Sequence, residues 1–171
     1  MRRSIKYDPL EDPIARLKDF RSSFTLNNII PQLSQCQITK ERFEHDGHSV
    51  DIYWINYPAR NFQGNSDKLL LYFHGGGYIS GDIQSTFECY LSQLFDLTIL
   101  HVEYRLSPEH PLSAAIDDTV AIYRALLHQT ISPSQILIIG DSAGGGLALL
   151  TIQAVLARQL RVSRGIIALS P

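Results

Sequence analysis

A serine set between glycines, at an expected strand-to-helix junction, is the residue of this sequence best suited to nucleophilic chemistry. Four apolar residues, 136–139, run directly into Gly140-Asp141-Ser142-Ala143-Gly144. The apolar run predicts a buried strand, and the Ala- and Leu-rich segment 147–160 predicts a helix. A sharp turn between them needs small flanking residues and pushes the serine hydroxyl outward. This pattern is typical of a serine that attacks an acyl carbon, although a Gly-rich turn with an incidental serine shares it.

A run of three glycines after a second apolar strand offers the other half of that chemistry. Residues 68–73 predict another buried strand, and His74-Gly75-Gly76-Gly77-Tyr78 follows it. Three glycines favour neither strand nor helix, but they let backbone N–H groups approach an anion with no side chain in the way. We expect the N–H groups of Gly76, Gly77 and Ala143 to form an oxyanion hole. A merely flexible loop becomes the weaker interpretation once both motifs occur in this order.

Three motifs together resemble the hormone-sensitive-lipase group of α/β-hydrolase esterases, which includes arylacetamide-deacetylase-like enzymes. They are the HGGGY motif at 74–78, the GDSAGG motif at 140–145 and the YRLSPEHP run at 104–111. The resemblance spans residues from about 50 to the C-terminus. It implies an α/β-hydrolase fold with Ser142 as the catalytic nucleophile. It also implies supporting roles for the motif residues His74, Gly75, Gly140, Asp141 and Gly144.

The resemblance implies a carboxylic-ester hydrolase, esterase- or lipase-like, that acts on a small-molecule ester through an acyl-enzyme. Neither a metal nor another cofactor is implied. Two positions depart from the family pattern: Gly146 stands where the family often has Asn, and Ser107 where it often has Ala. Neither departure touches the nucleophile or the oxyanion donors.

The sequence lacks the partners that a serine nucleophile needs. A hydroxyl requires a base and the base an orienting acid, and in this fold both follow the serine. No Asp, Glu or His occurs after Ser142. None of the upstream histidines can be placed beside the serine from the sequence; they are His45, His48, His74, His101, His110 and His128. We therefore expect the N-terminal portion of a longer esterase, truncated after the strand at 166–169, with doubtful activity of its own.

The alternative function is a catalytically inactive hydrolase fold that binds a small ligand or a partner, and amidase or peptidase action is a third. An intact serine and oxyanion loop argue mildly against a pure binder. The sequence does not indicate the acyl-chain or alcohol preference, or the oligomeric state.

The elements that must position these motifs follow from the periodicity of the chain. Strands are expected at 38–44, 50–55 and 97–104, and helices at 85–95 and 114–129. Alternating strands and helices predict a mostly parallel sheet covered on both faces, over residues 36–171. Residues 1–35 are expected to form a cap, with a helix from Glu11 to about Asn28 that Asp12 and Pro13 open. A loop is expected at 58–67.

Smaller features have structural interpretations. His45 and His48 flank Asp46 in an expected turn, where solvated loop residues are a better interpretation than a metal site. The acidic pair at 117–118 is expected to favour a helix N-terminus, and the charges of the loop at 105–111 are expected to brace the site.

Composition excludes several classes. With 44% hydrophobic and 19% charged residues the chain is typical of one globular domain. A net charge of -2 argues against nucleic-acid partners, and no apolar run is long enough for a transmembrane segment. The N-terminus does not resemble a secretory signal. Cys36 and Cys89 lie far apart and are expected to be reduced thiols in a cytoplasmic protein.

Overall fold

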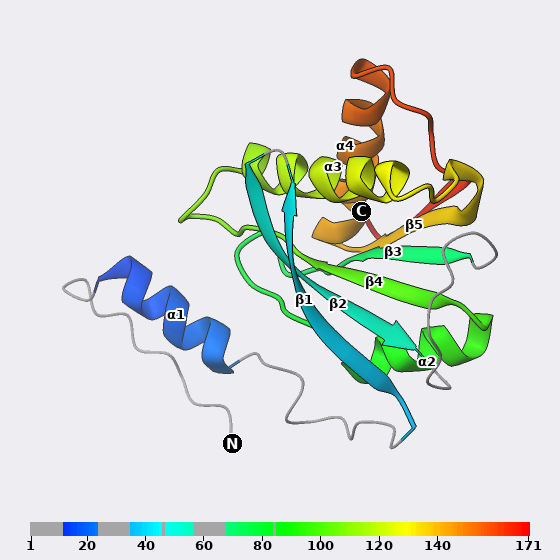
Figure 1. Cartoon of the computed structure of the whole chain (residues 1–171). Coiled ribbons are helices and arrows are strands. Elements are labelled where there is room, and N and C mark those ends of the chain that lie inside the picture. Colours follow the sequence, from blue (N-terminus) through cyan, green and yellow to red (C-terminus); the bar gives the residue numbers. More distant parts are fainter. Residues whose placement is uncertain (1–11, 24–34, 46, 57–67, 84) are drawn as a thin grey trace.

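A six-stranded sheet forms the centre of the molecule (Figure 1), in a computed structural model that describes residues 12–23, 35–45, 47–56, 68–83 and 85–171. Its strands, in chain order, are β1 (Gln37–His45), β2 (His48–Asn56), β3 (Leu69–Phe73), β4 (Thr98–Glu103), β5 (Ile136–Asp141) and β6 (Gly165–Leu169). Their spatial order is β1-β2-β4-β3-β5-β6. β4, β3, β5 and β6 run parallel, whereas β1 pairs with β2, and β2 with β4, in antiparallel register. The predicted, mostly parallel sheet is confirmed.

Three helices cover the two faces of this sheet within the described residues: α2 (Ser85–Phe95), α3 (Leu112–His128) and α4 (Ala143–Ala157). A further helix, α1 (Pro13–Ser23), lies apart from the sheet in Figure 1, and a short 3-10 turn occupies Pro133–Gln135. In Figure 1, α3 and α4 lie on one side of the sheet and α2 on the other. Residues of β3 alternate between the two cores: Leu71 packs in the cluster with α3 and α4, and Leu70 in the cluster with α2. Because both faces are covered, every residue of β3 is buried.

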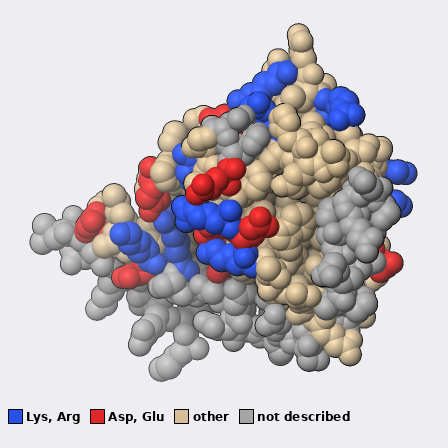
Figure 2. All heavy atoms as spheres, viewed as in Figure 1, with Lys and Arg blue, Asp and Glu red and all other residues tan. Residues whose placement is uncertain are grey.

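The two edges of the sheet differ in character. On β1, Lys40 forms an ion pair with Asp51 of β2 at 2.7 Å, and Arg42 approaches the same carboxylate. Figure 2, viewed as in Figure 1, shows acidic and basic groups intermixed on the face of the molecule that is turned toward the reader. On β6, Ile167 and Leu169 are partly exposed, and within the described residues β6 pairs with β5 alone. Charge protects the first edge from pairing with other chains, and the second edge lacks this protection.

The helix beginnings confirm one expectation and correct another. The Asp12 carboxylate accepts a hydrogen bond from the N–H of Ile14 at 3.0 Å, so Asp12 caps α1 as predicted. Residues 24–28 of the expected helix, and the expected loop at 58–67, lie outside the described residues.

α3 begins at Leu112, two residues before the predicted start at residue 114, so Asp117 and Asp118 lie beyond its first turn. Their predicted role as N-terminal charges is wrong; each binds an arginine instead.

The expectation of two reduced thiols is also wrong, because Cys36 and Cys89 form a disulfide. Their separation of 53 residues concealed the contact, which arises because the beginning of β1 lies beside α2. The predicted cytoplasmic location loses the support of free thiols, since disulfides are rare in that compartment. Within the described residues, no helix is both long and apolar enough to cross a membrane.

Candidate active site

Ser142 lies at the apex of a sharp turn between β5 and α4. Its φ of 50° and ψ of −122° are values that a non-glycine residue adopts only when the surrounding structure imposes them. The N–H of Ser142 donates to the C=O of Leu169 at 2.7 Å, and its C=O accepts from the N–H of Gly146 at 3.1 Å. The residue is exposed. The turn therefore presents the serine above the end of β5, as a nucleophile elbow would.

The glycines around this turn are required by close packing. A Cβ on Gly144 would collide with the carbonyl oxygen of Phe73, at the end of β3. A Cβ on Gly140 would collide with the carbonyl oxygen of Gly144. Only glycine permits α4 to start this close to the sheet, which is the physical reason for the G-x-S-x-G spacing.

The HGGGY loop begins beside this elbow. Phe73, the last residue of β3, pairs with Gly140 of β5, so the two motifs leave neighbouring strand ends. A Cβ on Gly75 would lie 3.2 Å from the Cβ of Ser142. Gly76 and Gly77 adopt φ values of +114° and +65°, which favour glycine. The structure thus brings the two sequence motifs into contact.

Three backbone N–H groups at this junction remain available. Among the hydrogen bonds of the described residues, none uses the N–H of Gly76, Gly77 or Ala143 as its donor. Ala143 opens α4, where the first N–H groups of a helix have no intrahelical acceptor. The helix N-terminus also carries a partial positive charge. The oxyanion role of these three N–H groups stays a prediction.

Asp141 has a side-chain partner that could not be predicted from the sequence. The hydroxyl of Tyr72 donates to its carboxylate at 2.6 Å. Burial, together with this carboxylate, raises the pKa of Tyr72. Nothing in the sequence indicates this hydrogen bond, because Tyr72 belongs to the apolar run at 69–73. That run predicts a buried strand and does not identify a partner for the tyrosine hydroxyl. The contact gives Asp141 a structural partner, and its supporting role at the site stays a prediction.

His74 is buried at the base of the HGGGY loop. Its Nδ1 lies 2.7 Å from the carbonyl oxygen of Gly75, and its own carbonyl accepts a hydrogen bond from the Tyr104 hydroxyl at 2.6 Å. The rings of His74 and Tyr104 stack with centroids 4.3 Å apart. Burial, followed by the positive charge of His101, lowers the pKa of His74. A neutral, buried imidazole therefore supports the loop and is not placed to act as a base.

No described histidine side chain forms a hydrogen bond with Ser142. His101 is fully buried as expected for a mid-strand residue, but it also binds Glu88, which sequence analysis missed. His48 lies 3.7 Å from Asp118, and the side chain of His45 lies outside the described residues. Within the described part of the chain, no group of three or more potential ligands is arranged to hold a metal.

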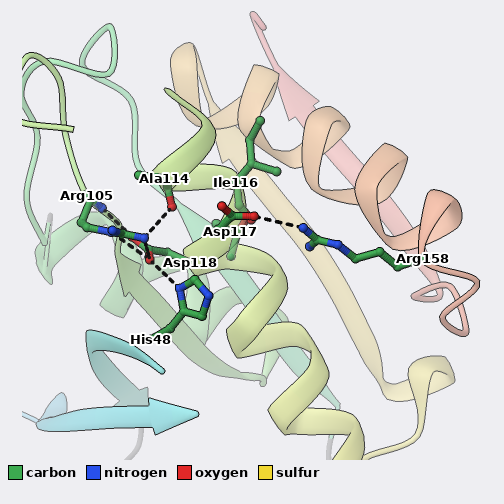
Figure 3. Close-up of polar contacts among 8 residues, drawn as sticks. His48, Arg105, Ala114, Ile116, Asp117, Asp118 and Arg158 are labelled. Carbon is green, nitrogen blue, oxygen red and sulfur yellow. Dashed lines mark hydrogen bonds and ion pairs between the residues drawn. The ribbon is translucent and has the colours of Figure 1, made fainter. Parts of the chain in front are cut away.

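The loop at 105–111 is braced on both sides by its charges. Arg105 binds the buried Asp118 of α3 through Nε and Nη2, with a shortest contact of 2.7 Å (Figure 3). From α1, Arg21 donates to both carboxylate oxygens of Glu109 and to the carbonyls of Ser107 and Ile79. The expectation that these charges brace the site agrees with these contacts. Arg21 was not identified from the sequence.

Comparisons with known proteins agree with this geometry. Residues 70–171 match the family described as alpha/beta hydrolase fold. The chain is 40% identical over 104 residues to an acetyl-hydrolase of Streptomyces hygroscopicus, which covers 60% of this chain and 33% of that protein.

Solved structures give the same result. An esterase from the bacterial hormone-sensitive lipase family has a TM-score of 0.76 at 33% identity, covering 88% of this chain and 50% of that one. The esterase EstE5, soaked with p-nitrophenyl butyrate, has a TM-score of 0.74 at 31% identity, covering 95% and 52%. The chain thus spans a third of the acetyl-hydrolase and about half of each solved chain.

Proposed function

The chain belongs to the alpha/beta hydrolase fold family, among the hormone-sensitive-lipase-like esterases, and from this membership we propose that it supplies the nucleophile of a serine carboxylic-ester hydrolase. The substrate class is a small-molecule ester. The observation that carries the proposal is the meeting of an exposed, conformationally strained Ser142 with three backbone N–H groups that lack an acceptor.

The proposed reaction begins with attack of the Ser142 Oγ on the ester carbonyl carbon, while a base takes the proton of the hydroxyl. The carbonyl oxygen becomes an anion, which the N–H groups of Gly76, Gly77 and Ala143 stabilise. The C–O bond to the alcohol then breaks, the alcohol leaves with a proton from the base, and Ser142 carries the acyl group. Water hydrolyses this acyl-enzyme and restores the serine.

The base and its acid are proposed to lie in the part of the relatives that this chain does not span. Two observations favour this: no Asp, Glu or His follows Ser142, and no described histidine contacts it. The proposal concerns the whole protein, of which residues 36–171 form an incomplete hydrolase domain. We further propose that residues 1–35 belong to a cap, because α1 is joined to the rim of the site through Arg21.

Hydrolysis of p-nitrophenyl butyrate by the full-length protein tests the proposal. Ser142→Ala should lower kcat at least about a thousandfold, since loss of the nucleophile removes most of the rate enhancement. Ser113→Ala, at an exposed position of α3, is the matched control and should leave the rate unchanged. Turnover that survives Ser142→Ala would contradict the proposed function.

An inactive binding protein is the second candidate, favoured by the absence of a described base beside Ser142. It predicts no turnover in the full-length protein, together with measurable binding of a non-hydrolysable ester analogue.

A further inference from the structure

A buried ion pair lies beneath the HGGGY loop, on residues that the proposed reaction does not use. Glu88 of α2 and His101 of β4 are both fully buried, with 2.6 Å between Oε1 and Nδ1. On its other side, Nε2 of His101 lies 3.3 Å from the carboxylate of Glu103. Ionised carboxylates only accept hydrogen bonds, so a histidine between two of them donates from both nitrogens and is positively charged.

The charged ring of His101 lies against His74. The two imidazoles are nearly parallel, at 11°, with centroids 5.6 Å apart. Burial is the main cause that lowers the pKa of His74, and the neighbouring positive charge of His101 lowers it further, so His74 is neutral. A neutral imidazole has one N–H, and because a carbonyl oxygen can only accept, Nδ1 of His74 donates to the carbonyl of Gly75.

This hydrogen bond orients a peptide plane of the proposed oxyanion hole. The carbonyl of Gly75 and the N–H of Gly76 belong to the same planar trans peptide, in which they point in opposite directions. Holding the carbonyl against His74 therefore fixes the direction of the Gly76 N–H. Gly81 closes over the same bond, because a Cβ there would collide with Nδ1 of His74.

We propose that Glu88 and His101 are positioning residues of this site: their buried ion pair fixes the His74–Gly75 hydrogen bond and, through it, the direction of the Gly76 N–H in the oxyanion loop. The inference rests on the proposed function for its catalytic meaning. Its structural content, the coupling of the ion pair to the loop, is independent of activity.

The coupling should depend on pH through His101. Burial alone would lower the pKa of His101, but Glu88 and Glu103 outweigh it and raise the pKa to about 9. Charged and titratable groups face this ring from several elements; they are Glu88 from α2, Tyr53 from β2, Tyr72 from β3, Glu103 from β4, and His74 and Asp82 from the segment between β3 and α2. Burial, followed by the negative charge of Glu103, raises the pKa of Asp82.

Nuclear magnetic resonance of the full chain tests the coupling without any substrate. As pH rises through about 9, deprotonation of the His101 ring should shift the backbone amide signals of Gly76 and Gly77 with the same midpoint. Glu88→Gln keeps the side-chain shape but removes the charge, so it should lower the midpoint of His101 and move both glycine amides at neutral pH. Asp117→Asn, an exposed carboxylate-to-amide control on α3, should do neither.

Amide signals of Gly76 and Gly77 that stay unchanged while His101 titrates would overturn the inference. The titration of the unaltered chain decides this even if Glu88→Gln does not fold. In the ester assay, Glu88→Gln should lower kcat about tenfold to a hundredfold with little change in KM, as expected for misplaced donors. An unaltered protein without Ser142-dependent turnover would contradict the proposed function, while the amide shifts would still decide the coupling.

Discussion

The hydroxyl of Tyr72 binds the carboxylate of Asp141, with 2.6 Å between Oη and Oδ1, one residue before the proposed nucleophile. The contact joins β3 to β5 at the strand ends from which the HGGGY loop and the elbow emerge. It also occupies the acidic group nearest to Ser142 in the sequence. Asp141 thus has a structural partner that fixes the approach to the elbow.

Tyr72→Phe is expected to destabilise the fold by about 1–3 kcal/mol, because it leaves a partly buried carboxylate without its donor. Urea unfolding of the variant and the unaltered chain measures the difference. Tyr90→Phe is the matched control, since Tyr90 is 53% exposed, and it should change stability by less than about 0.5 kcal/mol. Equal effects of the two variants would show that the hydrogen bond does not contribute.

Adjacent aspartates on α3 should differ sharply in their importance. Asp118 is 1% exposed and accepts hydrogen bonds from Arg105, so Asp118→Asn should cost about 1–3 kcal/mol, because the amide cannot accept from the guanidinium with both of its atoms. Asp117 is 44% exposed and binds Arg158, so Asp117→Asn should cost less than about 1 kcal/mol (Figure 3). Thermal or urea unfolding compares them directly. Similar losses for both would contradict the assigned burial.

Arg21 is expected to fasten α1 to the rim of the site. Arg21→Lys cannot reproduce the two-oxygen contact with Glu109 while also reaching two carbonyls, so hydrogen exchange within residues 13–23 should become faster. Arg161→Lys, in an exposed position, should leave this exchange unchanged. Unchanged exchange in Arg21→Lys would show that α1 is held by other contacts.

The same contact has a predictable pH dependence. The hydrogen bonds from Arg21 lower the pKa of Glu109 from 4.5 to about 2. A depressed carboxyl pKa stabilises the folded state above the unfolded value, so this contribution is present above pH 4.5 and is lost as pH falls through about 2. Protection of α1 should therefore persist from pH 7 to about 4.5. Its loss at a higher pH would contradict the assigned contact.

Local patterns were sufficient to predict the elements that carry the chemistry. The apolar runs at 136–139 and 68–73 and the glycines after them specify strand ends and turns, because each depends on neighbours in the sequence. The helix at 85–95 was likewise predicted with its observed bounds. Contacts between distant residues were missed, because they depend on sheet order and on which helix covers which face. Arg21–Glu109, Glu88–His101 and Cys36–Cys89 are all of this kind.

The disulfide gives a separate prediction. Protein prepared without reductant should show no thiol that iodoacetamide can alkylate, and reduction should lower the free energy of unfolding by about 2–4 kcal/mol, because the bond closes a long loop. A double variant, Cys36→Ser with Cys89→Ser, should be insensitive to reductant. Alkylation of both cysteines in the unreduced protein would contradict the observed pairing.

The central claim is that Ser142 is an acylable nucleophile, and the most direct measurement is mass spectrometry after treatment of the full-length protein with diethyl p-nitrophenyl phosphate. The account predicts one phosphoryl adduct per chain, located at Ser142 by peptide mapping and absent from Ser142→Ala. An adduct at another residue, or no adduct at Ser142 under conditions that label a known serine esterase, would contradict it.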